Sequence, residues 1–283
     1  MAPRIVVIAM GEMGSAVGRR LRERGANVLT SLAGRSAASR ARAEGAGIDI
    51  VDDDMKLVAD ADFVLSIIPP GEAAAFAARM APALSQSNRR PVFVDCNAVS
   101  PQTVRRVEAL IAPSGCPFVD AGIIGGPPRE GDDGPRFYAS GPHAAAFAAL
   151  RDYGLDVRPM EGTIGSASAL KLSYASLTKG LTALGAVMML GAGRAGVAAA
   201  LSGELGASQP ALKSWLERQV PRMYPKAYRW VAEMEEIAAY LEADPAGAEI
   251  YRGAARLFER LAEAHAAGGP EIASLKAFTA KQG

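Results

Sequence analysis

The chain has few residues of the kinds that build disulfide frameworks and metal sites. Its 283 residues include two cysteines, Cys96 and Cys116, and two histidines, His143 and His265. Two cysteines far apart in the sequence exclude a scaffold held together by disulfide bonds. Two cysteines and two histidines are also too few ligands for a zinc site. We predict that no metal is bound, and the scarcity of cysteine favours a cytoplasmic location.

The chain also lacks a charge excess and a long hydrophobic segment. It has 31 Lys and Arg residues against 30 Asp and Glu residues, which excludes the strongly basic surface of a nucleic-acid-binding protein. The longest weakly polar segment, residues 180–193, is shorter than the roughly 20 residues of a bilayer span, so we expect a buried helix and no membrane contact. A strand-like run begins at Arg4, which leaves no room for a secretory leader.

Apolar runs alternate with helical patterns as far as Gly165, and helical patterns follow alone. The predicted strands are residues 5–8, 28–30, 48–51, 63–68, 92–94, 118–119, 136–139 and 157. The predicted helices after Gly165 are residues 166–192, 195–204, 211–218, 225–241 and 245–265, with Ser166 or Ser168 as the cap of the first. This order predicts an α/β fold, a doubly wound parallel sheet of the Rossmann type in residues 1–164. A long interdomain helix, residues 165–193, then leads to an all-α C-terminal domain, residues 194–283.

A glycine-containing turn joins the first predicted strand to the first predicted helix, which begins near Ser15. Gly11 would let the backbone approach a pyrophosphate, and Gly14 would let the helix pack closely on the strand. The first glycine of the usual pattern is replaced by Ala9, so the turn must tolerate a methyl group. The alternative is a merely structural turn. The predicted dinucleotide contacts are Met10, Gly11, Glu12, Met13 and Gly14.

The end of the second predicted strand lacks the acidic residue that an NAD enzyme presents to the ribose hydroxyls. No Asp or Glu occurs between Gly25 and Ala43, whereas Arg35 and Ser36 offer a guanidinium and a hydroxyl, with Arg40 about one turn further on. A 2′-phosphate is bound by such donors, so NADP(H) is the predicted cofactor. The alternative is that both arginines are only solvated.

Lysine is scarce, and Lys171 stands in the first turns of the long predicted helix on an otherwise apolar segment. Burial and the helix N-terminus both disfavour the ammonium form, as a proton-transferring lysine requires. The alternative is a surface lysine with a buried stem. Lys226 and Arg229 share one face of a later helix, which is either solvated or directed toward a substrate or a second subunit. Residues 125–135 are rich in Gly, Pro and charge, as in a mobile flap or a solvated connector.

Five motifs together resemble the β-hydroxyacid dehydrogenase family, which includes 3-hydroxyisobutyrate and 6-phosphogluconate dehydrogenases. These motifs are residues 11–15, 66–69, 95–101, 120–126 and 165–171. The resemblance implies an active site between a Rossmann domain and a helical domain that forms a homodimer, with Lys171 as the general acid/base. It also implies that Gly125 and Gly126 hold a substrate carboxylate, that Asn97 meets both nicotinamide and substrate, and that Ile68 and Pro69 lie against the cofactor.

Two departures from the family pattern concern the substrate. Ile124 replaces a serine before the paired glycines, and Ala175 replaces an asparagine one turn after Lys171. Each change removes a polar contact, so we expect a more apolar pocket for a bulkier small-molecule substrate. The predicted function is an NADP(H)-dependent oxidoreductase that interconverts a hydroxyl and a carbonyl on a β-hydroxyacid-like compound. The alternatives are an imine reductase and a catalytically silent NADPH-binding scaffold.

Overall fold

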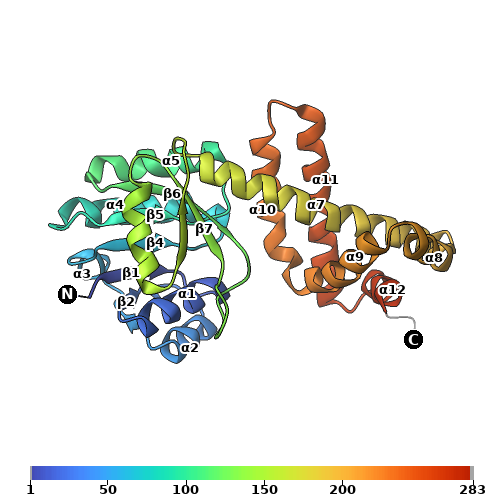
Figure 1. Ribbon diagram of the computed structural model, residues 1–283, viewed down its shortest axis with the longest axis horizontal. Helices are drawn as coiled ribbons and strands as arrows, with labels where there is room; N and C mark the ends of the chain where they lie inside the picture. The colour runs from blue at the N-terminus through green and yellow to red at the C-terminus, as the bar shows by residue number, and fades with distance from the viewer. Residues whose placement is uncertain (1, 281–283) are drawn as a thin grey trace. The chain divides into compact units, whose positions relative to one another are not determined.

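The computed structural model describes residues 2–280, and the chain divides into two compact units within one helix (Figure 1). The first unit ends at Leu172 and the second begins at Ser173. Both residues lie in helix α7 (Ser166–Arg194), so the predicted interdomain helix contributes its first two turns to the first unit and the rest to the second.

The first unit is built on one eight-stranded sheet with the order β3-β2-β1-β4-β5-β6-β7-β8. All neighbouring strands are parallel except β6 and β7, which are antiparallel. The order reverses at β1, as in a doubly wound Rossmann sheet, so the predicted fold class is confirmed. The strands are β1 (Arg4–Ile8), β2 (Asn27–Thr30), β3 (Asp49–Ile50), β4 (Phe63–Ser66), β5 (Val92–Asp95), β6 (Phe118–Ile124), β7 (Arg136–Ser140) and β8 (Asp156–Pro159).

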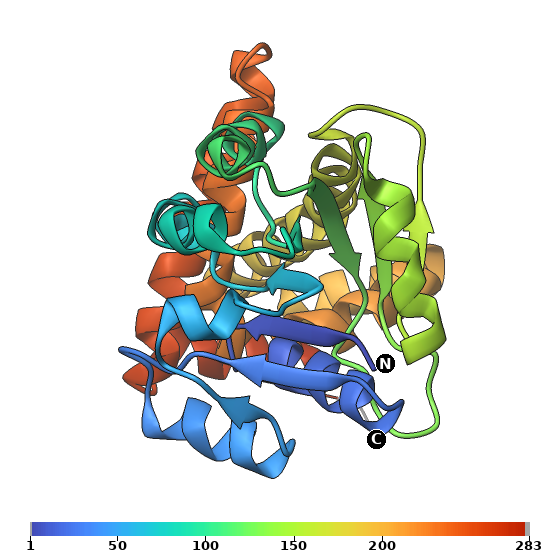
Figure 2. The same ribbon diagram turned by 90° about the vertical axis from the view of Figure 1, so that its left-hand side faces the viewer.

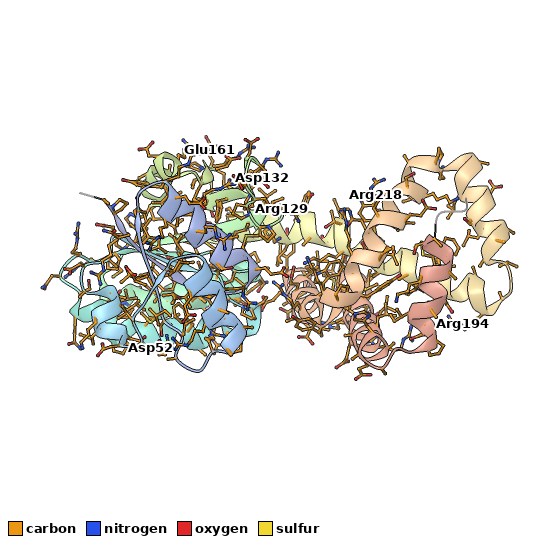
Figure 3. The ribbon with its side chains drawn as sticks, turned by 90° about the horizontal axis from the view of Figure 1, so that it is seen from below. Asp52, Arg129, Asp132, Glu161, Arg194 and Arg218 are labelled. Carbon is orange, nitrogen blue, oxygen red and sulfur yellow. The ribbon has the colours of Figure 1, made fainter. Side chains whose placement is uncertain are left out.

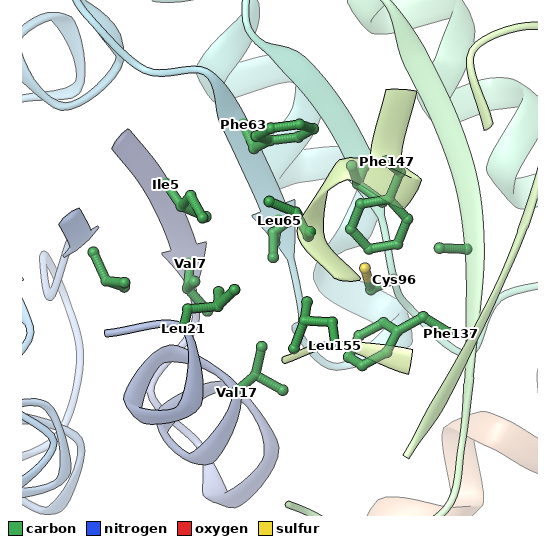
Figure 4. Close-up of a cluster of buried hydrophobic side chains, with 14 of the residues drawn as sticks. Ile5, Val7, Val17, Leu21, Phe63, Leu65, Cys96, Phe137, Phe147 and Leu155 are labelled. Atoms are coloured by element: carbon green, nitrogen blue, oxygen red, sulfur yellow. The ribbon is translucent and has the colours of Figure 1, made fainter. Parts of the chain in front are cut away.

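Helices cover both faces of this sheet (Figure 2). Alternate residues of β1 point to opposite sides, so Ile5 and Val7 enter one apolar cluster while Val6 and Ile8 enter the other. The first cluster, shown in Figure 4, includes side chains of α1, and the second includes side chains of α3, α4 and α5. The helices of this unit are α1 (Glu12–Glu23), α2 (Ala37–Gly45), α3 (Asp54–Val58), η1 (Pro70–Glu72), α4 (Ala73–Gln86), α5 (Pro101–Ile111), η2 (Ala112–Ser114), α6 (Ala144–Phe147) and η3 (Ala148–Tyr153).

The second unit is helical throughout its described residues. Within it α10 packs against α11, with the Trp230 ring edge-on to Phe258 at a centroid distance of 5.2 Å. The helices predicted here are present with shifted ends, and α12 was not predicted. These elements are α8 (Ala198–Ser208), α9 (Pro210–Met223), η4 (Tyr224–Lys226), α10 (Ala227–Tyr240), α11 (Pro245–Ala266) and α12 (Pro270–Thr279).

Of the helices described in residues 2–280, α7 is the one whose length and apolar composition would suffice for a membrane span. Such a single helix is weak evidence for a membrane, because the core helix of a soluble protein passes the same test. Its polar residues include Lys171 and Lys179, and both are half-buried.

Candidate active site

The glycine turn between β1 and α1 leaves room for a ligand. Gly11 is exposed, and a Cβ atom placed on it would meet no other atom within 4 Å. Helix α1 begins at Glu12, three residues earlier than predicted, so Glu12, Met13 and Gly14 form its first turn. The N–H groups and the positive dipole of a helix start favour a phosphate at this position.

Two contacts fix the shape of this turn. A Cβ atom on Gly14 would overlap the carbonyl oxygen of Ala9, so helix α1 packs directly on the end of β1 and tolerates only glycine there. The side chain of Met10 is fully buried, and its carbonyl oxygen accepts a hydrogen bond from Arg42 Nε at 2.8 Å. Arg42 lies on α2. Its contact with the glycine turn could not be predicted from the sequence, because only the fold brings these two segments together.

Acidic residues reach the end of β2 from other loops. The Arg35 guanidinium is 2.7 Å from the carboxylate of Glu72 in η1, and the backbone N–H of Leu32 donates to Asp52 Oδ1 at 2.7 Å. Ser36 is the N-cap of α2, where its hydroxyl accepts a hydrogen bond from the N–H of Ser39. Arg35 and Ser36 are therefore adjacent at this edge, as predicted, but Glu72 and Asp52 are present beside them.

Asn97 ties the ends of β4 and β5 together. Its Oδ1 accepts a hydrogen bond from the N–H of Ile68 at 2.7 Å, and its Nδ2 donates to Ser66 Oγ at 3.0 Å. The side chain is 2% exposed, and its own N–H donates to Asp95 Oδ1 at 2.9 Å. Asn97 thus holds the segment that contains Ile68 and Pro69, the two residues predicted to lie against the cofactor.

A buried carboxylate from the sheet caps the long helix α7. Asp120 of β6 is fully buried, and its Oδ2 accepts hydrogen bonds from the backbone N–H groups of Gly165, Ala167 and Ser168 at 2.8 to 3.1 Å. Ser168 Oγ donates to the other oxygen at 2.6 Å, and Ser140 Oγ donates to Oδ2 at 2.9 Å. The prediction of a serine cap at Ser166 or Ser168 was wrong, because the acceptor comes from a strand 46 residues before Ser166 in the chain.

Helix α7 then passes directly over Gly122. A Cβ atom on Gly122 would lie 2.8 Å from both the Ala167 carbonyl oxygen and Lys171 Cβ. One helical turn from Ala167 to Lys171 advances about 6 Å, close to the two-residue advance of about 6.6 Å from Asp120 to Gly122. The helix therefore runs alongside β6 toward its carboxyl end, and Lys171 is half-buried there.

The segment after β6 contains the predicted carboxylate-binding residues. Ile124 is buried, while Gly125 and Gly126 are exposed and open the loop that leads to β7. Gly125 has a φ of 128°, and a Cβ atom there would lie 3.0 Å from Pro135 Cα, so glycine is required. These three residues follow directly on the part of β6 that contacts Lys171.

The loop from Gly126 to Pro135 is tied to helix α1. Arg20 Nη2 lies 2.9 Å from Asp132 Oδ1 and also donates to the carbonyl oxygen of Arg129 at 2.7 Å. The N–H of Arg129 donates to the same Asp132 oxygen at 2.9 Å, and Figure 3 shows these two loop residues close together. This N–H and the Arg20 guanidinium lower the pKa of Asp132, so the carboxylate stays ionised. The loop thus has defined contacts with the helix that follows the glycine turn.

Three further predicted residues belong to the second unit. Ala175 is buried on α7, one turn after Lys171. Lys226 and Arg229 are exposed at the start of α10, and Glu233, further along this helix, forms an ion pair with Lys179. The assignment of these residues to a substrate site stays a prediction.

The thiol of Cys96 is a buried group near two acidic residues, Asp95 and Asp120. It is buried at the end of β5, next to Asp95. Burial raises its pKa well above the usual range, and the nearby Asp95 and Asp120 carboxylates raise it further. Cys96 is thus a neutral core thiol and not a nucleophile.

The comparison with known proteins decides the family. Residues 4–153, more than half of the chain, match the family described as the NAD binding domain of 6-phosphogluconate dehydrogenase. The chain belongs to this family. The protein is therefore an NAD(P)-dependent oxidoreductase. The predicted family and enzyme class are confirmed. A second match, residues 192–261, is to a domain of unknown function, DUF1932, in the helical region.

Two relatives have similar sequences over much of their length. The conserved protein MTH1747, whose structure is described as similar to 3-hydroxyacid dehydrogenases, is 31% identical with a TM-score of 0.68, and the match covers 94% of this chain and 99% of that protein. An uncharacterised 28.5 kDa protein of Methanothermus fervidus is 29% identical over 181 residues, 64% of this chain and 67% of that protein.

More distant solved structures share the fold. The 3-hydroxyisobutyrate dehydrogenase of Mycobacterium tuberculosis, solved with L-serine, is 19% identical with a TM-score of 0.74, and the match covers 99% of this chain and all of that one. An imine reductase of Myxococcus stipitatus in complex with NADP+ is 18% identical with a TM-score of 0.56 and the same coverage. At these identities the likeness concerns the fold, which is common to both classes of reductase.

Proposed function

We propose that the protein is an NADP(H)-dependent oxidoreductase that interconverts a hydroxyl and a carbonyl on a β-hydroxyacid-like substrate, with Lys171 as general acid/base. The observation that supports this most is the packing of Lys171 Cβ against Gly122. Strands β1 and β6 run in the same direction, so the carboxyl end of β6 shares an edge of the sheet with the glycine turn. The fold thus holds a lysine at the edge where a Rossmann sheet binds its dinucleotide.

The chemistry divides between the cofactor and the lysine. The nicotinamide, when bound, supplies or accepts hydride at C4. In the reducing direction the Lys171 ammonium donates a proton to the oxygen of the carbonyl being reduced; in the oxidising direction the neutral amine accepts the hydroxyl proton. Asp120 is a positioning residue in this scheme, because it fixes the helix start from which Lys171 projects.

The cofactor half of the proposal rests on the edge formed by β1, β2 and β4. The glycine turn would hold the pyrophosphate, with Arg35 and Ser36 as donors to a 2′-phosphate. Ile68, Pro69 and the buried Asn97 would shape the nicotinamide side, where Asn97 acts mainly by holding Ile68.

The substrate half follows from the segment after Gly122. The N–H groups of Gly125 and Gly126 would bind a carboxylate next to the buried Ile124, and the buried Ala175 is proposed as a further apolar contact for the substrate. Lys226 and Arg229 are proposed as further cationic contacts for the substrate. A bulkier hydroxyacid or ketoacid fits such a pocket better than a small polar one.

The decisive experiment combines nucleotide titration with one variant. NADPH and NADH are titrated by fluorescence, and turnover is then measured with panels of β-hydroxyacids, ketoacids and cyclic imines. Lys171→Met is expected to lower turnover by about 10²- to 10⁴-fold with the Kd of NADPH nearly unchanged. Lys276→Met, at an exposed lysine of α12, is the matched control and should change neither quantity. Unchanged turnover in Lys171→Met would refute the assigned role.

Imine reduction is the second candidate, favoured by the apolar residues Ile124 and Ala175 and by the fold shared with an imine reductase. Turnover of the cyclic imines alone would select it over hydroxyacid oxidation. Binding of NADPH without turnover of any panel would select a scaffold without catalytic activity. Retention of Lys171 at the helix start favours an enzyme over that third possibility.

We also propose a homodimer in the cytoplasm, formed through α7. Six large apolar side chains on this helix are exposed, with exposed fractions from 39% to 74%. Beside Val187, five of them have heptad-like spacing: Tyr174, Leu177, Leu181, Leu184 and Met188. Such a stripe on a long helix is typical of a helix–helix interface. The two cysteines are free and buried, which fits a reducing compartment. Light scattering of Leu177→Glu and Leu184→Glu should give a monomer where the native chain gives a dimer.

A further inference from the structure

The ion pair between Arg35 and Glu72 spans the place where the cofactor's adenosine ribose is expected. Arg35 follows β2 and Glu72 follows β4, and these strands are the two neighbours of β1. The pair, with its charged atoms 2.7 Å apart, therefore crosses the carboxyl end of β1, where the glycine turn begins. Both side chains are partly exposed, 28% for Arg35 and 46% for Glu72, so a ligand has access to them.

We infer that Glu72 is a specificity-determining residue for the cofactor: its carboxylate competes with a 2′-phosphate for Arg35 and lowers the preference for NADPH over NADH. This inference rests on the proposed function, because it concerns the same cofactor site. Glu72 supplies, from a different loop, the acidic side chain that the segment from Gly25 to Ala43 lacks. A 2′-phosphate would have to take the Arg35 donors from the Glu72 carboxylate, whereas NADH carries only a hydroxyl there and can leave the ion pair intact.

Two features of the surroundings support this assignment. Arg35 is placed by a turn in which its N–H donates to the Leu32 carbonyl oxygen at 2.9 Å, so its backbone is fixed whichever partner its guanidinium takes. The Leu32 N–H is bound by Asp52, so that carboxylate already has a backbone partner at the same edge. Of the two acidic residues at this edge, Glu72 is the one paired with Arg35, the cation that would bind the 2′-phosphate of NADPH.

The test compares the ratio of the NADH and NADPH dissociation constants in four proteins: native, Glu72→Gln, Arg35→Ala and the double variant. Glu72→Gln is expected to raise the preference for NADPH by about three- to tenfold, the range for a partly exposed charged pair and a phosphate contact. In the Arg35→Ala background the same substitution should change the ratio by less than about twofold, because the guanidinium for which carboxylate and phosphate compete is absent. Glu44→Gln, at an exposed glutamate of α2, removes the same charge and should leave the ratio unchanged.

Each outcome has one meaning. A ratio unaffected by Glu72→Gln, or equally affected by Glu44→Gln, overturns the inference while the proposed function stands. A full effect of Glu72→Gln in the Arg35→Ala background shows general repulsion of the phosphate and overturns competition for Arg35. Failure of the native protein to bind either nucleotide removes the proposed function and the inference together. Thermal unfolding of each variant establishes that it is folded.

Discussion

Ser168 Oγ lies 2.6 Å from the Asp120 carboxylate, and this hydrogen bond joins the first turn of α7 to strand β6 of the sheet. The same carboxylate accepts three backbone N–H groups at the start of the helix. A helix N-terminus leaves its first N–H groups without intrahelical partners, and a negative charge there is favourable. Asp120 thus fixes the position and direction of α7 before the chain reaches Lys171.

Asp120→Asn should lower the free energy of unfolding of the first unit by about 2–4 kcal/mol. The side chain of residue 120 is fully buried, and its oxygens accept hydrogen bonds from the backbone N–H groups that begin α7. In the asparagine variant an NH₂ group would replace one of these oxygens and would face donors instead of accepting from them. Urea denaturation measures the loss, and Asp133→Asn, at an exposed aspartate of the loop before β7, should change stability by less than about 0.5 kcal/mol. Equal effects in the two variants would contradict the capping role.

Gly122→Ala should displace α7 from the sheet. The added methyl would lie 2.8 Å from a backbone oxygen, which has no rotamer to change, so we expect a loss of about 1–3 kcal/mol and a lower turnover number. Gly191→Ala is the matched control in the same helix, because its added methyl meets no atom within 4 Å. That variant should be as stable as the native chain or more stable by up to about 1 kcal/mol.

Arg42→Met should weaken NADPH and NADH to a similar extent. The hydrogen bond from Arg42 to the Met10 carbonyl oxygen fixes the turn that would hold the pyrophosphate, a group common to both nucleotides. We expect about a fivefold increase in both dissociation constants, the typical contribution of one hydrogen bond. Arg35→Ala provides the contrast, since it should weaken NADPH alone. A selective loss of NADPH in Arg42→Met would show that Arg42 contacts the 2′-phosphate instead.

Tyr224 should make the stability of the helical unit fall at high pH. The residue is 4% exposed, and burial raises its pKa to about 12, above the ordinary value of 10. The folded state therefore favours the neutral phenol. The stability that the neutral phenol contributes is complete below about pH 10 and is lost as the pH rises through about 12. The free energy of unfolding of Tyr224→Phe should fall less than that of the native chain between about pH 8 and 11.5. Tyr228→Phe, at a tyrosine that is 66% exposed, should follow the native curve.

The sequence was sufficient for features that consecutive residues determine. The first strand, the glycine turn and α1 follow one another along the chain. The period of their apolar residues predicted the strand and the helix, and the glycines predicted the turn between them. Helix α5 begins at Pro101, a start that the sequence itself indicates because proline is favoured in the first turn. Helix α12 could have been predicted from the same signal at Gly269 and Pro270, which are its N-cap and first residue.

Contacts between distant segments could not be predicted in this way. Asp120 caps α7 from another element, Glu72 reaches Arg35 across β1, and Arg42 binds the glycine turn from α2. Asp120 lies in one of the family motifs, but no local pattern assigns any of these three side chains to its partner. Their roles depend on strand order and on which loops share one edge of the sheet. For the same reason, the sequence motifs contained both Lys171 and Gly122 but did not show that the lysine packs over this glycine.

The division of the chain after Leu172 has a mechanical consequence for catalysis. Lys171 and the glycine turn belong to the same unit, and Asp120 anchors the helix start within that unit. In the proposed reaction, the distance between a bound dinucleotide and Lys171 would then be set within the first unit alone. Substitutions at the proposed substrate contacts Lys226 and Arg229, which lie in the second unit, would then leave the alignment of hydride and proton unchanged, so the proposed reaction and its selectivity could be engineered separately.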